Sequence, residues 1–276
     1  MKKAILITGA SSGIGKEIAK TLAKEGYRVF AGVRKKADKY KLEKIDKNII
    51  GVYLDVTNSA SIDKAFWFIL KQTESLDALI NNAGIAIGGP MEFMPIKKLK
   101  EQFEVNTFAP VAVAQRFLPM LGFGKIINIS SMASSGLFPF AAPYCASKRS
   151  LDILFRALEI ELTENNIKVV SIKPGVMRTP IWDKTIKHSF DFIPDKAKEK
   201  YKKELNFLER NTYNNNLTGE SPQLVAKAVL KAIKAKNPKP SYKVGADAKF
   251  ILALAKLPER FVNFVIKKSL KSRVNR

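Results

Sequence analysis

The sequence predicts one α/β domain with a doubly wound parallel sheet covered by helices on both faces. Short β-branched runs alternate with amphipathic segments of helical period through the first half of the chain, an order typical of repeated βα units. The runs are apolar throughout rather than alternating, as in strands buried on both faces. No internal repeat or low-complexity linker divides the chain, so residues 1–276 are expected to form a single domain.

The individual elements follow from the same patterns. Apolar β-branched runs predict strands at residues 4–7, 28–33, 49–54, 78–80, 125–129 and 169–172. Helical periodicity predicts helices at residues 14–25, 61–73, 99–121, 144–163 and 222–234. Because helices separate successive strands, the strands are expected to run parallel.

The net charge of +23 is the unusual feature of the composition. Such a charge can indicate a nucleic-acid or anionic-membrane partner. The lysines are scattered, however, and the chain has no RNA-reading aromatic motif and no DNA-reading zinc finger. Nucleic acid is therefore not expected as a partner.

Cys145 and His188 are the only residues of their types. They exclude an internal disulfide and a Cys/His zinc site, so no metal is expected. The apolar run at residues 4–7 is too short for a signal peptide, and no segment approaches the ~20 apolar residues of a membrane span. These features predict a non-spanning, cytoplasmic protein in a reducing compartment.

A glycine-rich turn, Thr8-Gly-Ala-Ser-Ser-Gly-Ile-Gly15, lies between the first strand and the first helix. Glycines at this position allow a tight turn and close approach of the backbone to a pyrophosphate, which the start of the helix attracts. The turn therefore predicts dinucleotide binding.

The spacing of this turn resembles the cofactor loop of the short-chain dehydrogenase/reductase family. Four further motifs occur in the family's order: Asn81-Asn-Ala-Gly84, Ser131, Tyr144-Cys-Ala-Ser-Lys148 and Pro174-Gly175. The resemblance implies a Rossmann-type fold. It also implies an oxidoreductase that transfers a hydride between a nicotinamide cofactor and a carbonyl or secondary alcohol.

The resemblance implies four catalytic residues: Asn106, Ser131, Tyr144 and Lys148. Tyr144 and Lys148 are four residues apart, so a helix places them on one face, where an ammonium is expected to lower the pKa of the phenol. In the family, the tyrosine exchanges a proton with the carbonyl oxygen, the serine holds that oxygen, and the asparagine holds a water. Ser130 is the alternative serine, but the thirteen-residue spacing to Tyr144 favours Ser131.

The family pattern extends to a larger set of cofactor-binding residues. These are Gly9, Ser11, Ser12, Gly13, Ile14, Gly15, Arg34, Asp55, Val56, Asn82, Ala83, Gly84, Tyr144, Lys148, Pro174, Gly175, Val176 and Thr179. The second strand ends without the acid that binds a ribose 2′-hydroxyl in NAD enzymes, and Arg34 follows it directly. Because an arginine can bind a 2′-phosphate with two hydrogen bonds, NADP(H) is predicted in preference to NAD(H).

The resemblance implies a substrate lid at residues 180–220, and residues 246–276 are expected to form a basic, amphipathic C-terminal extension. The lid is rich in aromatic residues, which favours an apolar substrate. The Tyr-Cys-Ala-Ser-Lys motif and residues 241–248 resemble more narrowly a branch with 17β-hydroxysteroid dehydrogenase type 1-like, retinol dehydrogenase-like and acyl-dihydroxyacetone-phosphate reductase-like enzymes. That branch implies lipid, steroid-like or retinoid-like carbonyls.

The C-terminal extension has three open interpretations. It can lie on an anionic membrane, pack on its own domain, or contact a second subunit. Pro258 is expected to divide it into two segments. Family members are mostly homodimers or homotetramers built through the two long helices, here residues 99–121 and 144–163.

Two other functions also fit the motifs. A 3-oxoacyl-carrier-protein reductase has the same fold and chemistry. A catalytically silent NADP-binding sensor or scaffold shares the glycine-rich loop, but such proteins usually lack part of the catalytic set, which is complete here.

Overall fold

The structure is a computed structural model that describes residues 3–254 and 257–274, and in them one all-parallel sheet of seven strands. The spatial order is β3 (Ile49–Tyr53), β2 (Arg28–Val33), β1 (Ala4–Ile7), β4 (Ala78–Asn81), β5 (Lys125–Ile129), β6 (Lys168–Pro174) and β7 (Ser241–Val244). The order reverses between β1 and β4, as in a doubly wound sheet. The predicted fold class is confirmed.

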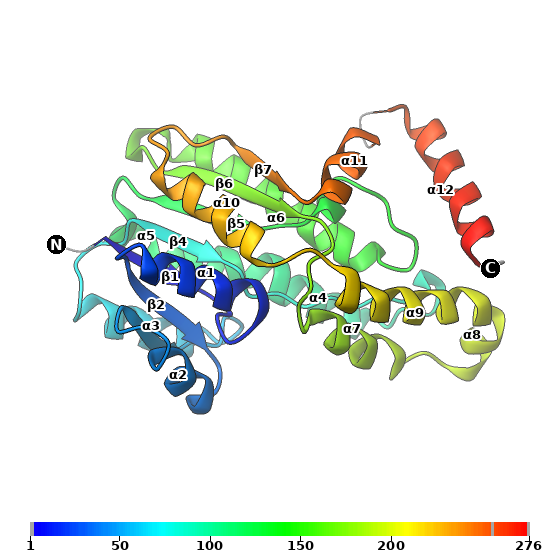
Figure 1. Cartoon of the computed structure of the whole chain (residues 1–276), viewed down its shortest axis with the longest axis horizontal. Coiled ribbons are helices and arrows are strands. Elements are labelled where there is room, and N and C mark those ends of the chain that lie inside the picture. The colour runs from blue at the N-terminus through cyan, green and yellow to red at the C-terminus, as the bar shows by residue number, and fades with distance from the viewer. Residues whose placement is uncertain (1–2, 255–256, 275–276) are drawn as a thin grey trace.

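Helices cover both faces of this sheet (Figure 1). One face carries α1 (Gly13–Lys24), α2 (Lys36–Glu43) and α10 (Gln223–Lys234), and the other carries α3 (Ser59–Leu70), α5 (Ala109–Leu121) and α6 (Ala142–Glu161). Strand β1 shows why helices must pack on both faces of the sheet, since it has apolar side chains on each face. Ile5 and Ile7 belong to one apolar core, whereas Ala4 and Leu6 belong to the other.

Three local features differ from the sequence-based expectation. Helix α2 was not predicted because it is strongly polar and buries only Leu42. Strand β7 was not predicted because it is a short edge strand that buries only Val244. The long helix expected at residues 99–121 is α4 (Ile96–Phe103) and α5 joined by a π-helical turn, Glu104–Phe108. Single 3-10 turns occupy Met91–Phe93, Met132–Ser134 and Thr163–Asn165.

The predicted lid contains three helices, α7 (Ile181–Phe190), α8 (Asp195–Lys200) and α9 (Lys202–Thr218). A small apolar cluster of its own, around Ile193, Ala197 and Leu205, holds the lid together, and Phe192 and Tyr201 pack against it. Some of the lid's aromatic residues therefore serve packing within the lid itself.

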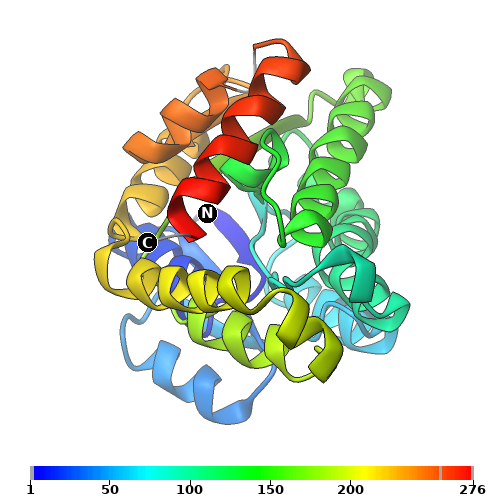
Figure 2. The same ribbon diagram turned by 90° about the vertical axis from the view of Figure 1, so that its right-hand side faces the viewer.

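The C-terminal extension forms α11 (Ala246–Leu254) and α12 (Glu259–Val274). Helix α12 runs across one side of the molecule between α11 and α9 (Figure 2). The side chains of Lys271 and Arg273 and all of Arg276 lie outside the described part of the chain. Among the described residues, no helix combines the length and the apolar character needed to cross a membrane.

Candidate active site

A cavity of about 1760 Å³ opens at the carboxyl ends of the strands, beside the reversal between β1 and β4. Ligands of open α/β sheets bind at such a reversal, because the crossovers on its two sides leave in opposite directions. Every site residue predicted from the sequence lines this cavity except Asn106, which is fully buried behind its wall.

Thr8 and Asn82 join the glycine-rich turn to the end of β4. The Asn82 Nδ2 atom donates to the carbonyl oxygens of Thr8 and Gly9, both at 2.9 Å. The Thr8 hydroxyl accepts from the backbone N–H groups of Asn82 and Ala83, both at 3.0 Å. These bonds fix the turn relative to β4. The sequence pattern predicted no role for Thr8 beyond its place in the turn.

The backbone of the turn packs so closely against neighbouring residues that only glycine fits at some of its positions. A turn without side chains at these positions can also approach a dinucleotide closely. A Cβ atom on Gly15 would lie 2.4 Å from Asn82 Nδ2, and one on Gly13 would lie 3.2 Å from the Cβ of Thr179. Gly9 and Gly13 also have positive φ angles. The Ser12 side chain does not cap α1, and the first turn of α1 contains no acid, so the dipole at this helix start can act on a phosphate.

The far end of the cavity is lined by Arg34, Lys35 and Asp38, beside the end of β2. Arg34 is exposed, as a side chain that binds a phosphate at the cavity edge would be. Asp38, in the first turn of α2, was not among the predicted site residues because α2 itself was not predicted. Asp55 lines the same region, and its Oδ1 atom accepts from the Thr57 hydroxyl at 2.8 Å.

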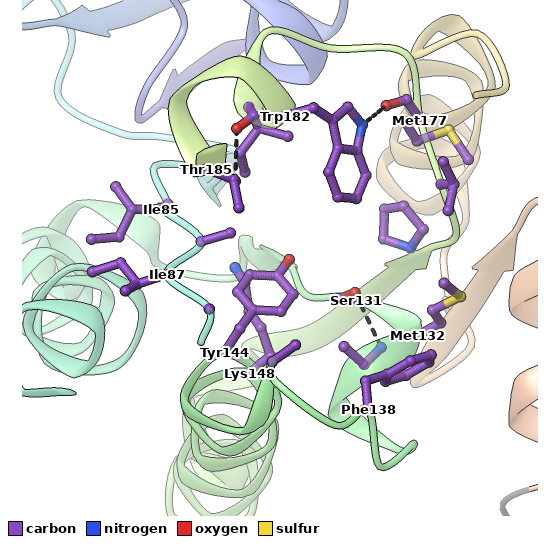
Figure 3. A pocket seen from close by; sticks show the side chains of 18 of the residues that line it. Ile85, Ile87, Ser131, Met132, Phe138, Tyr144, Lys148, Met177, Trp182 and Thr185 are labelled. Carbon is purple, nitrogen blue, oxygen red and sulfur yellow. Dashed lines mark hydrogen bonds between the residues drawn. The ribbon is translucent and has the colours of Figure 1, made fainter. Parts of the chain in front are cut away.

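Tyr144, Ser131 and Lys148 meet on one wall of the cavity (Figure 3). Tyr144 and Lys148 share one face of α6, and Ser131 follows β5 and begins the 3-10 turn that leads toward α6. Lys148 Nζ donates to the carbonyl oxygen of Ile129 at 2.8 Å. The three residues that the family pattern groups together are therefore neighbours in space. Ser130 also lines the cavity but is buried, and its hydroxyl has no partner among the described residues.

Burial shifts the pKa values of both titratable side chains on this wall, Tyr144 and Lys148. It raises the pKa of the Tyr144 phenol to about 12, although a hydrogen bond with Ser131 acts to lower it. It lowers the pKa of the Lys148 ammonium to about 8, although the charge of Asp152 acts to raise it. The net shift of the Tyr144 pKa is therefore upward, opposite to the expected lowering, because loss of hydration outweighs the effect of Ser131.

Asn106 lies in the π-helical turn, and its side chain is fully engaged. Its Oδ1 accepts from the backbone N–H of Ile85 at 2.9 Å, and its Nδ2 donates to the Ile85 carbonyl and the Ser147 hydroxyl. A Cβ atom on Gly84 would lie 3.3 Å from Asn106 Oδ1 and 3.6 Å from Lys148 Nζ. Asn106 thus holds the Gly84–Ile85 segment beside Lys148, a positioning function that the sequence analysis did not anticipate.

Asp247, at the start of α11, is a second residue that the sequence analysis did not assign to the site. Its Oδ2 accepts from the backbone N–H of Val176 at 2.6 Å. A Cβ atom on Gly175 would lie 1.8 Å from Asp247 Oδ1, so only glycine fits beside this carboxylate. The bond joins the predicted cofactor loop after β6 to the C-terminal extension. The Gly245-Ala-Asp247 motif was the available signal, but it does not reveal a contact with Val176.

The part of the cavity beyond Tyr144 is predominantly apolar (Figure 3). Ile85 and Ile87 lie on one side and Met132, Phe138 and Met177 on the other. Trp182 of the lid closes this part, and its Nε1 donates to the Met177 carbonyl at 2.7 Å. The α11–α12 wall is formed by Phe250, Ile251, Leu254, Leu257, Val262, Val265, Ile266 and Leu270. An apolar molecule can therefore extend from Tyr144 toward α12.

Comparisons with known proteins give one consistent family. Residues 3–189 match the family model described as short chain dehydrogenase. The chain is 34% identical to an NADPH-dependent 3-dehydrocapnine reductase of Ornithobacterium rhinotracheale, over 96% of both chains. It is 32% identical to a 3-ketodihydrosphingosine reductase of Bacteroides thetaiotaomicron, over 95% of this chain and 96% of that one. The solved structure of a short-chain dehydrogenase from Streptomyces avermitilis superposes with a TM-score of 0.78 at 25% identity, covering 98% of this chain and 97% of that chain.

Replacing Lys148 by methionine is expected to stabilise the fold at neutral pH. The pKa of Lys148 falls from 10.5 to about 8 on folding, so the folded state carries an unfavourable buried ammonium below pH ~8. The penalty disappears as the pH rises from about 8 to 10.5, where the folded chain has released its proton and the unfolded chain has not. Lys148→Met should therefore raise the unfolding free energy by up to about 3 kcal/mol at neutral pH. Loss of the hydrogen bond to the Ile129 carbonyl reduces this gain.

Denaturant unfolding at neutral pH and near pH ~10, compared with wild type, measures this difference. The gain should shrink at the higher pH, and the exposed Lys64→Met control should show no such pattern. A gain of equal size at both pH values would contradict a depressed pKa.

Replacing Asp247 by alanine is expected to lower the unfolding free energy by about 2 kcal/mol, because the Val176 N–H loses a charged acceptor. Asp247→Asn keeps an acceptor oxygen and should lose about half as much. Urea unfolding of both variants tests this. Equal losses for alanine and asparagine would show that the hydrogen bond to Val176 contributes little.

Proposed function

The chain belongs to the short-chain dehydrogenase/reductase family, and we propose that it uses NADP(H), in preference to NAD(H), to interconvert an apolar carbonyl compound and its secondary alcohol. The coarser function, an NAD(P)-dependent oxidoreductase acting on carbonyl or alcohol groups, follows from the family and its relatives. The observation that carries the finer proposal is the meeting of Tyr144, Ser131 and Lys148 between a glycine-rich phosphate loop and an apolar pocket.

The chain's own residues can hold the cofactor along the whole cavity. The backbone around Gly13 and Gly15 would receive the pyrophosphate, Arg34 the 2′-phosphate, and the Val176–Thr179 loop the nicotinamide. When bound, NADP(H) supplies or accepts the hydride at the carbon of the carbonyl group. The exposed Arg34 at the end of β2 supports the NADP preference, as does the NADPH dependence of the 3-dehydrocapnine reductase.

Tyr144 would exchange a proton with the substrate oxygen. Burial keeps its pKa at about 12, so the phenol is protonated at neutral pH and can donate to a carbonyl oxygen as negative charge develops there. Ser131, whose hydroxyl lies on the same wall of the cavity, would donate to the same oxygen. Lys148 would bind the ribose hydroxyls, and Asn106 would keep the Gly84–Ile85 segment in place beside Lys148. The proton-returning water that the family pattern assigns to Asn106 would need a group other than this engaged side chain.

An apolar substrate is supported by the walls beyond Tyr144. These walls are predominantly aliphatic, methionine and aromatic side chains from the segments that follow the strands, from the lid and from both C-terminal helices. Relatives that cover nearly the whole chain are named as reductases of 3-dehydrocapnine and 3-ketodihydrosphingosine. We propose a lipid, steroid-like or retinoid-like ketone as the substrate class.

A homo-oligomer and a reducing, cytoplasmic location complete the proposal. Large apolar side chains are exposed at Phe108, in the π-helical turn before α5, and at three positions of α6, Ile153, Leu154 and Ile160. A second copy that covered them would bury this surface. The single cysteine, Cys145, is free and buried, which suits a reducing compartment.

The first test of the proposed function is thermal stability with NADPH or NADH, followed by a panel of carbonyl compounds. NADPH should stabilise the chain at lower concentration than NADH, because binding to the folded state alone raises stability. Long-chain and ring ketones should be reduced faster than sugars, small polar carbonyls and 3-oxoacyl thioesters. Faster reduction of the thioesters would favour the carrier-protein reductase instead.

Replacing Tyr144 by phenylalanine should lower the rate of ketone reduction about 10²- to 10⁴-fold, because the general acid is removed. Stabilisation by NADPH should persist, which shows that the cavity is intact. Steady-state kinetics and thermal unfolding measure the two properties. Turnover within a few-fold of wild type would exclude Tyr144 as the proton donor.

Replacing Arg34 by alanine should weaken NADPH binding about 10- to 100-fold, because charge-assisted bonds to the 2′-phosphate are lost. Binding of NADH, which lacks this phosphate, should change little and serves as the internal control. Fluorescence titration of both cofactors measures the ratio. An equal loss for NADPH and NADH would contradict the predicted role of Arg34.

A further inference from the structure

The cavity is long and reaches the surface at more than one place, and one of these openings lies at the C-terminal helices, where two apolar residues line the cavity and are also exposed. Phe250 of α11 is 68% exposed, and Leu257, just before α12, is 45% exposed. Helix α12 crosses the same side of the molecule (Figure 2). This opening, called the mouth below, is therefore bordered by the two C-terminal helices.

Helix α12 has two different apolar faces. Its inner face lines the cavity with Val262, Val265 and Ile266. On its outer face, Phe261 and Phe264 are 51% and 62% exposed. Packing against the cavity therefore explains the inner face but leaves the outer phenylalanines uncovered.

The outer phenylalanines are surrounded by positive charge. Arg260, Lys267 and Lys268 are exposed, and their spacing from Phe264 places them on the same side of the helix. Glu259, the only acidic residue of α12, lines the cavity instead. The outer face thus combines aromatic rings with basic side chains and carries no acid.

We propose that this outer face of α12 docks on the surface of an anionic phospholipid bilayer, with the cavity mouth beside the lipid. Aromatic rings insert at the level of the headgroups, and lysine and arginine keep their charges at the phosphates. A second copy of the chain fits this face poorly, because a symmetric contact would bring two positively charged surfaces together.

Docking would shorten the path of the substrate. An apolar ketone could pass from the bilayer through the mouth at Phe250 and Leu257 to Tyr144 without crossing bulk water. This step rests on the proposed function, whereas docking itself does not.

The test is co-sedimentation of the full chain with phosphatidylcholine vesicles, with and without phosphatidylglycerol. Wild type should partition at least about tenfold more strongly onto the anionic vesicles. Lys267→Gln/Lys268→Gln should weaken this partitioning about tenfold or more, because two surface charges are lost. Phe261→Ser/Phe264→Ser should weaken it to a similar extent by removing the inserted rings.

Lys227→Gln/Lys231→Gln is the matched control, because it removes the same charge from the exposed surface of α10. It should partition like wild type, and all variants should unfold at the wild-type temperature. Equal weakening in the control would show attraction by net charge alone and would overturn the proposal. The proposal would also be overturned if the wild-type chain did not partition onto anionic vesicles. A third contrary result would be a phenylalanine variant that changes its oligomeric state but still partitions like wild type.

Activity separates docking from the proposed function. Both α12 variants should reduce a water-soluble ketone at the wild-type rate and a vesicle-borne ketone more slowly. Partitioning as expected, together with no reduction of either ketone, would leave docking supported and the proposed function refuted.

Discussion

The hydrogen bonds from Asn82 to Thr8 and Gly9 join the two halves of the sheet at the point where the strand order reverses. Parallel strands leave a crevice there, because the connections on its two sides diverge. The Asn82 amide occupies the space that a side chain on Gly15 would need, so the turn can follow its path only with glycine. One side chain thereby fixes the phosphate loop, the end of β4 and the start of α1 relative to one another. The groups at the phosphate end of the cavity are positioned by that frame.

Burial is the second constraint, and it acts on both titrating groups of the site. The walls that exclude water lower the pKa of Lys148 and raise the pKa of Tyr144. For Tyr144 the shift preserves the protonated phenol that carbonyl reduction requires. For Lys148 the shift disfavours the charged form, and the Ile129 carbonyl offsets that only in part. A site arranged in this way is less stable than an apolar one, as expected where function requires a buried charge.

The sequence was sufficient to predict the parts of the fold that depend on local patterns. Apolar runs marked six of the seven strands, and the motifs at their ends marked the groups around the cavity, because parallel strands bring their carboxyl ends to one edge. Helix α2 has no apolar stripe, and the edge strand β7 buries a single residue, so neither produced a signal. The bond between Asp247 and Val176 joins residues 71 positions apart. Nothing in the local sequence predicts such a partner, or the pKa of a side chain that distant walls bury.

On the proposed chemistry, Tyr144 and Ser131 contact only the substrate oxygen, so they cannot distinguish one ketone from another. Discrimination falls to the lid, which is held by a small cluster of its own, and to the C-terminal helices. An apolar pocket separates substrates weakly, by about 1–3 kcal/mol for each methylene group. Such walls favour a class of apolar ketones rather than one compound. A pocket that accepts many apolar ketones reduces mainly those that reach its mouth. The location of the mouth therefore contributes to the choice of substrate.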